Sequence, residues 1–69
     1  MKKADQSKEF RADRFMAGGG HNVQYFPTEE AARAFLEGNR EGARSAFVLR
    51  RVFYSEKTKG LYRPVLRVF

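Results

Sequence analysis

Few side chains in this sequence are suited to covalent or acid–base chemistry. The chain has no cysteine and a single histidine, His21. The serines at 7, 45 and 55 have no sequence neighbours that suggest a nucleophile paired with a base. One imidazole without any thiolate also supplies too few ligands for a structural zinc site. We therefore expect a protein that is not an enzyme and that has no catalytic, cofactor-binding or metal-binding residues.

Two short motifs have simpler structural explanations than functional ones. The paired carboxylates Glu29 and Glu30 follow Pro27 and Thr28, as expected of the first turn of a helix, where the helix dipole favours negative charge. The triplet Gly18-Gly19-Gly20 could form a backbone nest for an anion. It lacks the following Lys-Ser/Thr and the strand-to-helix context of a phosphate loop, so we interpret it as a turn.

Binding chemistry is better represented, because the net charge of +6 is concentrated in the last part of the chain. Residues 1–41 carry seven basic and seven acidic side chains, whereas residues 42–69 carry seven basic side chains and one acidic side chain. Five of those seven cations are arginines, which suit bidentate contacts with phosphate or carboxylate. We expect a surface here for an anionic partner. The candidate binding residues are Arg50, Arg51, Lys57, Lys59, Arg63, Arg67 and Phe69.

The elements that position these residues follow from local patterns. Residues 1–8 lack periodicity and are expected to be a flexible tail before a single domain over 9–69. Residues 9–17 fit a strand better than a helix, because a helix would break their apolar face. After the glycine turn, 22–26 is rich in strand formers. A helix should begin after Thr28 and end at Gly38, or at Gly42 if it continues.

The closing segments 45–54 and 61–69 are rich in β-branched and aromatic residues and predict a hairpin, with Gly60 in a left-handed conformation. Simple alternation in the last strand places Arg63 and Arg67 on a solvent face. The opposite, core-facing set is Tyr62, Pro64, Leu66 and Val68. Because proline cannot donate a ladder hydrogen bond, Pro64 indicates an edge strand or a bulge.

Two registers of this hairpin remain open at the level of sequence. In one, Arg51 lies opposite Arg67, and Val48, Val52 and Tyr54 join the apolar face. In the other, Arg50 lies opposite Arg67, and Phe47, Leu49 and Phe53 face the core. Both registers place two arginines opposite each other on the solvent face, with Arg63 two residues along, and such pairs are mildly destabilising. The concentration of arginine beside aromatic residues therefore favours a binding role.

The expected fold is α+β, with one helix packed on a small antiparallel sheet in the order β-β-α-β-β. The sheet has three or four strands, depending on whether 9–17 forms the first. Because a chain of 69 residues buries little core and has no disulfides, we expect a homodimer. The sequence shows neither a signal-peptide pattern nor an apolar run of about 20 residues, so we expect a cytoplasmic protein without membrane contacts.

The favoured function is nucleic-acid binding, to DNA or RNA, through the arginine-rich hairpin. One alternative is a small inhibitor or adaptor, of the type common in phages and mobile elements, that covers an acidic surface of a partner protein. A second alternative is a structural subunit of a homo-oligomer.

Overall fold

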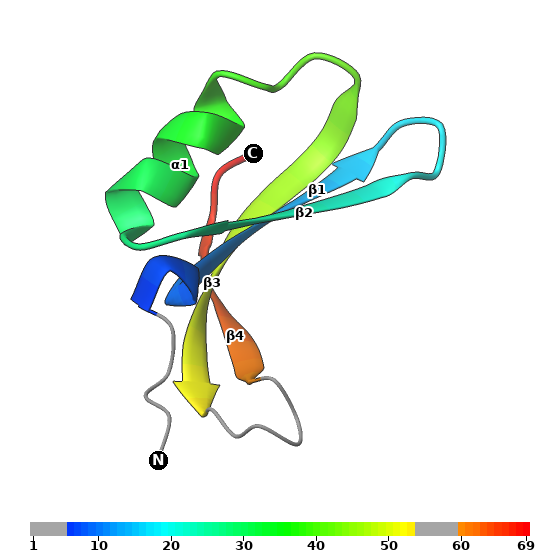
Figure 1. Ribbon diagram of the computed structural model, residues 1–69. Helices are drawn as coiled ribbons and strands as arrows, with labels where there is room; N and C mark the ends of the chain where they lie inside the picture. The colour runs from blue at the N-terminus through cyan, green and yellow to red at the C-terminus, as the bar shows by residue number, and fades with distance from the viewer. Residues whose placement is uncertain (1–5, 54–59) are drawn as a thin grey trace.

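The computed structural model describes residues 6–53 and 60–69, which form one helix on one face of a four-stranded antiparallel sheet (Figure 1). The strand order is β2-β1-β3-β4, so β2 and β4 are the edges. This arrangement confirms the expected α+β class. The elements are a 3-10 turn η1 (Gln6–Lys8), β1 (Phe10–Met16), β2 (His21–Phe26), α1 (Glu29–Glu37), β3 (Ala43–Phe53) and β4 (Leu61–Arg67).

Helix α1 begins and ends as its capping residues predict. The side-chain oxygen of Thr28 accepts a hydrogen bond of 3.1 Å from the backbone N–H of Ala31. This bond satisfies one of the donors that a helix start leaves unpaired. Gly38 is the C-cap, and its N–H donates to the carbonyl of Ala34 at 3.0 Å.

Residues 10–16 form a strand, which confirms the preference for strand over helix. Strand β1 pairs with β2 from Phe10 opposite Phe26 to Phe15 opposite His21. Gly19 has a φ of 101°, a conformation that favours glycine, so the triplet makes the tight turn between the two strands.

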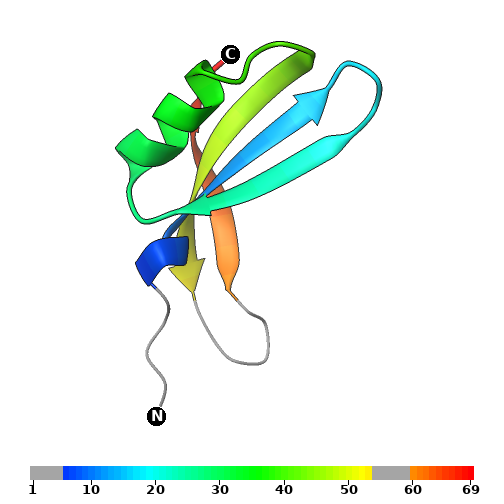
Figure 2. The ribbon, with the colours of Figure 1, turned by 45° about the horizontal axis from the view of Figure 1, so that its top comes forward.

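The core lies between α1 and one face of the sheet (Figures 1 and 2). Ala12, Ala46 and Val48 of the central strands are buried against Ala32 and Leu36 of the helix. Small side chains on these strands let the helix approach closely. Larger, partly buried residues surround this centre: Phe10, Phe26, Phe35, Leu66, Val68 and Phe69.

The pairing of β3 with β4 corrects both expected registers. Phe47 lies opposite Arg67, and Arg50 lies opposite Arg63. Neither Arg50 nor Arg51 faces Arg67. The connection is longer than a tight turn ending at Gly60 would need, because Leu61 pairs with Phe53. Gly60 does have the expected positive φ, 104°.

A bulge also corrects the expected faces of β4. Val48 pairs with Leu66 but Leu49 pairs with Pro64, so Val65 is an extra residue between the two pairs. An extra residue reverses the alternation of side chains beyond it. Leu66 therefore faces the helix, whereas Pro64 faces the opposite side. The expectation that Tyr62, Pro64, Leu66 and Val68 share one core face is wrong for this reason.

The N-terminal segment differs from the expected tail where it is described. Residues Gln6–Lys8 form the 3-10 turn, and the Tyr62 hydroxyl donates to the carbonyl of Lys8 at 2.6 Å. This bond joins the turn to edge strand β4. Residues 1–5 lie outside the described part of the chain. Within the described residues, no helix is long and apolar enough to cross a membrane.

Candidate binding site

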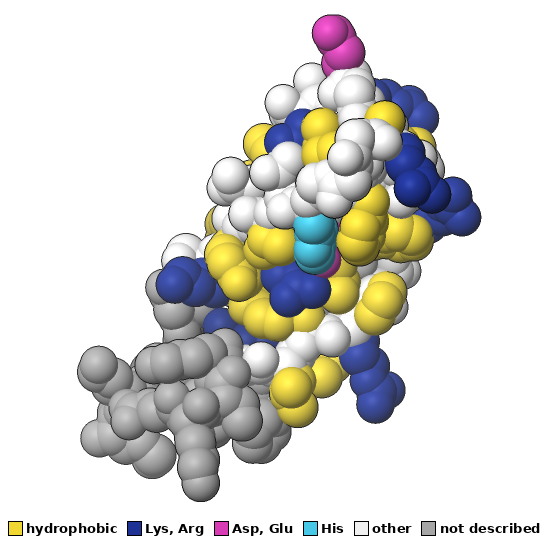
Figure 3. All heavy atoms as spheres, turned by 90° about the vertical axis from the view of Figure 1, so that its right-hand side faces the viewer, with side chains coloured by type: hydrophobic (Ala, Val, Ile, Leu, Met, Phe, Trp, Pro, Cys, Tyr) yellow, Lys and Arg dark blue, Asp and Glu magenta, His cyan; other side chains and the backbone are white. Residues whose placement is uncertain are grey.

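The sheet face opposite α1, here called the open face, is not covered by α1 (Figure 1). The 3-10 turn η1 contacts it at one end, where Lys8 lies against Tyr25 and Tyr62. The members of the open face follow from the strand registers, because residues paired across strands share a face. In space-filling view, hydrophobic side chains lie on both sides of the single imidazole, and a basic side chain lies next to it (Figure 3). The open face carries His21, Val23 and Tyr25 of β2, Arg11, Asp13 and Phe15 of β1, Phe47, Leu49 and Arg51 of β3, and Tyr62, Pro64 and Arg67 of β4.

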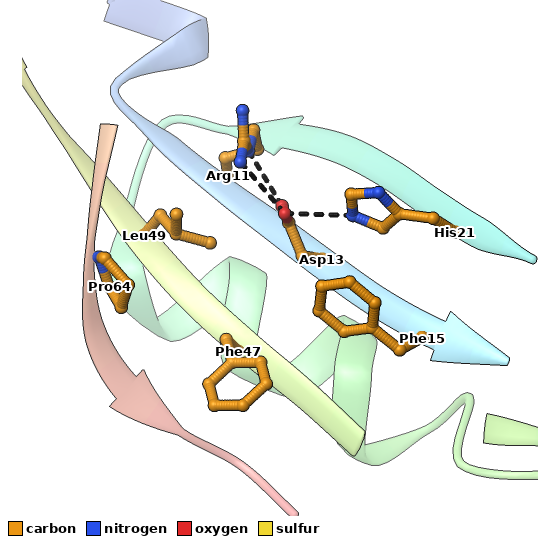
Figure 4. Close-up of a pocket in the computed structure, with 7 residues that line it drawn as sticks. All are labelled: Arg11, Asp13, Phe15, His21, Phe47, Leu49 and Pro64. Atoms are coloured by element: carbon orange, nitrogen blue, oxygen red, sulfur yellow. Dashed lines mark hydrogen bonds and ion pairs between the residues drawn. The ribbon is translucent and has the colours of Figure 1, made fainter. Parts of the chain in front are cut away.

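A pocket of about 360 Å³ lies on this face and draws on all four strands (Figure 4). Such a volume lies at the small end of the range of ligand sites, about 300–1,000 Å³. Its lining residues are Arg11, Asp13, Phe15, His21, Phe47, Leu49 and Pro64. Most of these are apolar or aromatic, with a small polar group at one side, which is the usual composition of a binding pocket.

The polar group is centred on Asp13, which is only 3 % exposed. Its carboxylate accepts two hydrogen bonds from Arg11, from Nε at 2.8 Å and from Nη2 at 2.9 Å. His21 Nε2 lies 3.1 Å from the second carboxylate oxygen. Burial of a carboxylate is costly unless it is paired and hydrogen-bonded, and these contacts meet both conditions. The group also connects β1 to β2 across the open face.

Aromatic rings form one wall of the pocket. The Phe15 ring stacks on His21, with 4.4 Å between centroids and an interplanar angle of 10°. Phe47 packs edge to face against Phe15, with 6.0 Å between ring centroids and an interplanar angle of 77°. The guanidinium of Arg67 lies over the Phe47 ring, 5.6 Å from its centroid. Flat rings and a cation are therefore presented together on this side of the face.

A second aromatic group lies beyond Arg11. The rings of Tyr25 and Tyr62 are 5.9 Å apart, and the Arg11 guanidinium carbon lies 5.2 Å from the centroid of Tyr62. Lys8 Nζ lies 5.7 Å from the centroid of Tyr25. Burial raises the pKa of the Tyr62 hydroxyl above 10.0, and this effect exceeds the opposing influence of the nearby Arg51 charge.

The residues expected to bind a partner are divided between the two faces of the sheet. The side chain of Arg51 is 6 % exposed, and its Nη2 lies 3.2 Å from Glu9. It is therefore held within the protein. Arg50 is exposed on the other face, where its guanidinium lies over Phe10 and 3.7 Å from the second oxygen of Glu9. The carboxylate of Glu9 thus lies close to the positive charges of both adjacent arginines, Arg50 and Arg51.

Arg63 and Arg67 do not share a face, which corrects the expected surface centred on them. Arg63 pairs with Arg50 on the helix side of the sheet, whereas Arg67 pairs with Phe47 on the open face. Phe69 is half-buried against the core, with Arg40 over its ring at 4.6 Å. Lys57 and Lys59 lie outside the described residues.

The pocket residues were not among the candidates expected from sequence. A signal for them exists in the alternation of β1, which places Arg11, Asp13 and Phe15 on one face. The matching residues of β2 are His21, Val23 and Tyr25. The residues of β1 and β2 line the pocket together with residues of β3, which pairs with β1. This pairing joins segments that are distant in sequence, so local patterns do not reveal it.

The pocket lining combines one carboxylate–imidazole pair with apolar and aromatic side chains. Asp13 and His21 are oriented as a carboxylate–imidazole pair, but the pocket lining contains no hydroxyl, thiol or amine nucleophile. Within the described residues, no three His, Cys, Asp or Glu side chains are grouped closely enough to hold a metal ion. Comparison of the chain with protein-family models, curated proteins and solved structures finds no match.

Proposed function

We propose that this protein binds single-stranded nucleic acid on the open face of its sheet. The observation that carries the proposal is the combination of exposed aromatic rings with arginine on the sheet face that α1 leaves uncovered. Base–aromatic stacking supplies about 1–3 kcal/mol per base and tolerates any sequence. Phe15, Phe47 and Tyr25 are the rings in reach, since each is exposed or half-buried.

The charge distribution supports the same partner. The chain has a net charge of +6, and the carboxylate in the pocket, Asp13, is buried and compensated by Arg11. The helix glutamates Glu29, Glu30 and Glu37 lie on the element that covers the opposite face. A polyanion approaching the open face therefore meets Arg67 without meeting the acidic helix.

A single strand fits this face better than a duplex does. In a duplex the flat surfaces of the bases are stacked on one another and are not accessible to side chains. The hairpin arginines expected to contact nucleic acid lie on two faces, with Arg63 on one and Arg67 on the other. What the open face offers is rings and a pocket, and these suit unstacked bases.

Fluorescence anisotropy with labelled, unstructured DNA and RNA oligonucleotides tests the proposal, with duplexes of the same length in parallel. We expect single strands to bind more tightly than duplexes, with an affinity that falls as salt rises. The variant F15L removes a ring from the open face, and F35L is its matched control on the helix side. We expect F15L to weaken binding about fivefold or more and F35L to leave it unchanged if folded. No binding at low salt contradicts the proposal.

Self-association is a second candidate, favoured by the difference between the two sheet edges. Edge strand β4 has Pro64, a bulge and two arginines, all of which discourage pairing with another strand. Edge strand β2 has no proline and no lysine or arginine, and its pairing with β1 is regular. Pairing of β2 with β2 of a second copy would make a homodimer with a continuous sheet. Sedimentation at micromolar concentration tests this, and a strict monomer contradicts it.

A further inference from the structure

We propose that Arg11 gives the open face a preference for guanine over adenine in the bound strand. This inference rests on the proposed binding of single-stranded nucleic acid and adds a base specificity to it. Arg11 stands at the rim of the pocket, where its side chain is 27 % exposed, whereas that of Asp13 beneath it is 4 % exposed. Of Arg11 and Asp13, the arginine is therefore the side chain that a ligand can contact.

The guanidinium of Arg11 is fixed in orientation before any ligand arrives. Asp13 binds its Nε and Nη2 atoms at 2.8 and 2.9 Å, which leaves the plane of the group little freedom. The ring of Tyr62 lies beside the guanidinium, with 5.2 Å between the ring centroid and the guanidinium carbon. In the close-up, one nitrogen of Arg11 points away from Asp13 (Figure 4). Among the described residues, Nη1 has no hydrogen-bond partner.

The outer edge of such an arginine offers two parallel N–H donors, one from Nη1 and one from Nη2. Guanine presents two neighbouring acceptors, N7 and O6, that match this edge. Adenine replaces O6 by an amino group, which is a donor and cannot accept from Arg11. Of the two purines, guanine is therefore the one that satisfies both donors.

A backbone phosphate also has two acceptors, but the surroundings of Arg11 favour a neutral ligand. The Asp13 carboxylate is bonded to the same guanidinium and repels a second negative charge. The pocket beside Arg11 is lined mainly by rings and aliphatic side chains, including Phe47, Leu49 and Pro64. These groups suit the body of a base better than they suit a charged phosphate.

The experiment compares oligothymidylates of about 12 nucleotides that carry central guanines, adenines or 7-deazaguanines, with binding measured by anisotropy. We expect guanine to raise affinity about fivefold to 100-fold over adenine, the range of one bidentate arginine–guanine contact. The analogue 7-deazaguanine lacks the N7 acceptor and should lose most of that gain. Because these arms use the unaltered protein, they do not depend on any variant folding.

A second arm uses R11K, which keeps the positive charge but lacks the planar fork. We expect R11K to bind all three oligonucleotides with similar affinity, whereas R33K on the helix keeps the preference for guanine. Circular dichroism establishes that each variant is folded. Equal affinity of the unaltered protein for all bases overturns the inference and leaves the proposed function standing, as does an R11K variant that retains the guanine preference. Absence of binding to every strand overturns the proposed function itself.

Discussion

The two faces of the sheet are built from alternate residues of the same strands, yet the residues at their centres differ in size and charge. Toward α1, the central strands β1 and β3 place Ala12, Ala46 and Val48, all buried. Toward the open side, the same strands place Arg11, Asp13 and Phe15, with Phe47 beside them. At the centre of the sheet, one face supplies small buried side chains and the other supplies an ion pair beside aromatic rings. In so small a protein, α1 packs on a single face and leaves the second accessible to solvent.

The faces also differ in what holds their residues in place. On the helix side, contacts are mainly apolar and non-directional, centred on Leu36 and Val48. On the open face, directional bonds fix the geometry, as Asp13 binds both Arg11 and His21. Directional bonds keep donors in fixed positions, which recognition of a ligand requires and packing alone does not provide.

The largest effect on the free energy of unfolding is expected when a buried side chain is removed from the helix side. Leu36 is completely buried, so L36A should lower the free energy of unfolding by about 2–5 kcal/mol, through lost burial and a residual cavity. The matched control is L61A, because Leu61 is 55 % exposed and its loss should cost about 0.5 kcal/mol or less. Urea titration measures both. Equal effects would show that the two leucines are buried to a similar extent in solution.

The second test acts on the open face. D13N removes the buried charge that Arg11 and His21 face, and it should cost about 1–3 kcal/mol, because the hydrogen bonds from Arg11 lose their charged acceptor. The matched control is E37Q, which breaks the exposed 3.5 Å pair between Glu37 and Arg33 and should cost less than about 0.5 kcal/mol. A D13N variant as stable as E37Q would mean that the pocket network contributes nothing.

Local elements of this fold could be predicted from sequence, because their causes lie within a few residues. Thr28 caps the helix, Gly38 ends it, and Gly60 takes its positive φ, each within one short segment. The pairing of the closing hairpin could not be predicted. Its register depends on the extra residue Val65 and on which side chains α1 buries, and both are settled by tertiary packing.

The candidate site shows the same division. Simple alternation predicts that Arg63 and Arg67 share a solvent face. A single bulge between them places them on opposite faces instead. The residues that do meet come from strands distant in sequence, as with Phe15 and Phe47. Alternation within β1 gives the face of each residue, whereas only the β1–β3 pairing gives its neighbours.

A smaller effect tests whether the N-terminal turn belongs to the open-face network. Y62F removes the hydroxyl that donates to the Lys8 carbonyl at 2.6 Å and keeps the ring that packs on Arg11. We expect a loss of about 0.5–1.5 kcal/mol, the usual net value of one hydrogen bond, together with faster amide exchange near Lys8. Y25F is the control, because Tyr25 keeps its ring contacts. If Y62F exchanges no faster than Y25F, the turn does not depend on this bond.

The smallest expected effect is on stability at alkaline pH. Because burial raises the pKa of Tyr62 above 10.0, the native state holds this proton more tightly than the unfolded state does. Below pH 10.0 the hydroxyl is protonated in both states, so its contribution to stability is fully present. As pH rises further, the unfolded chain ionises first, and the contribution is lost as pH passes through the native pKa. Urea midpoints should therefore fall more steeply above pH 10.0 for the unaltered protein than for Y62F, whereas parallel curves would show that the hydroxyl has the same pKa in both states.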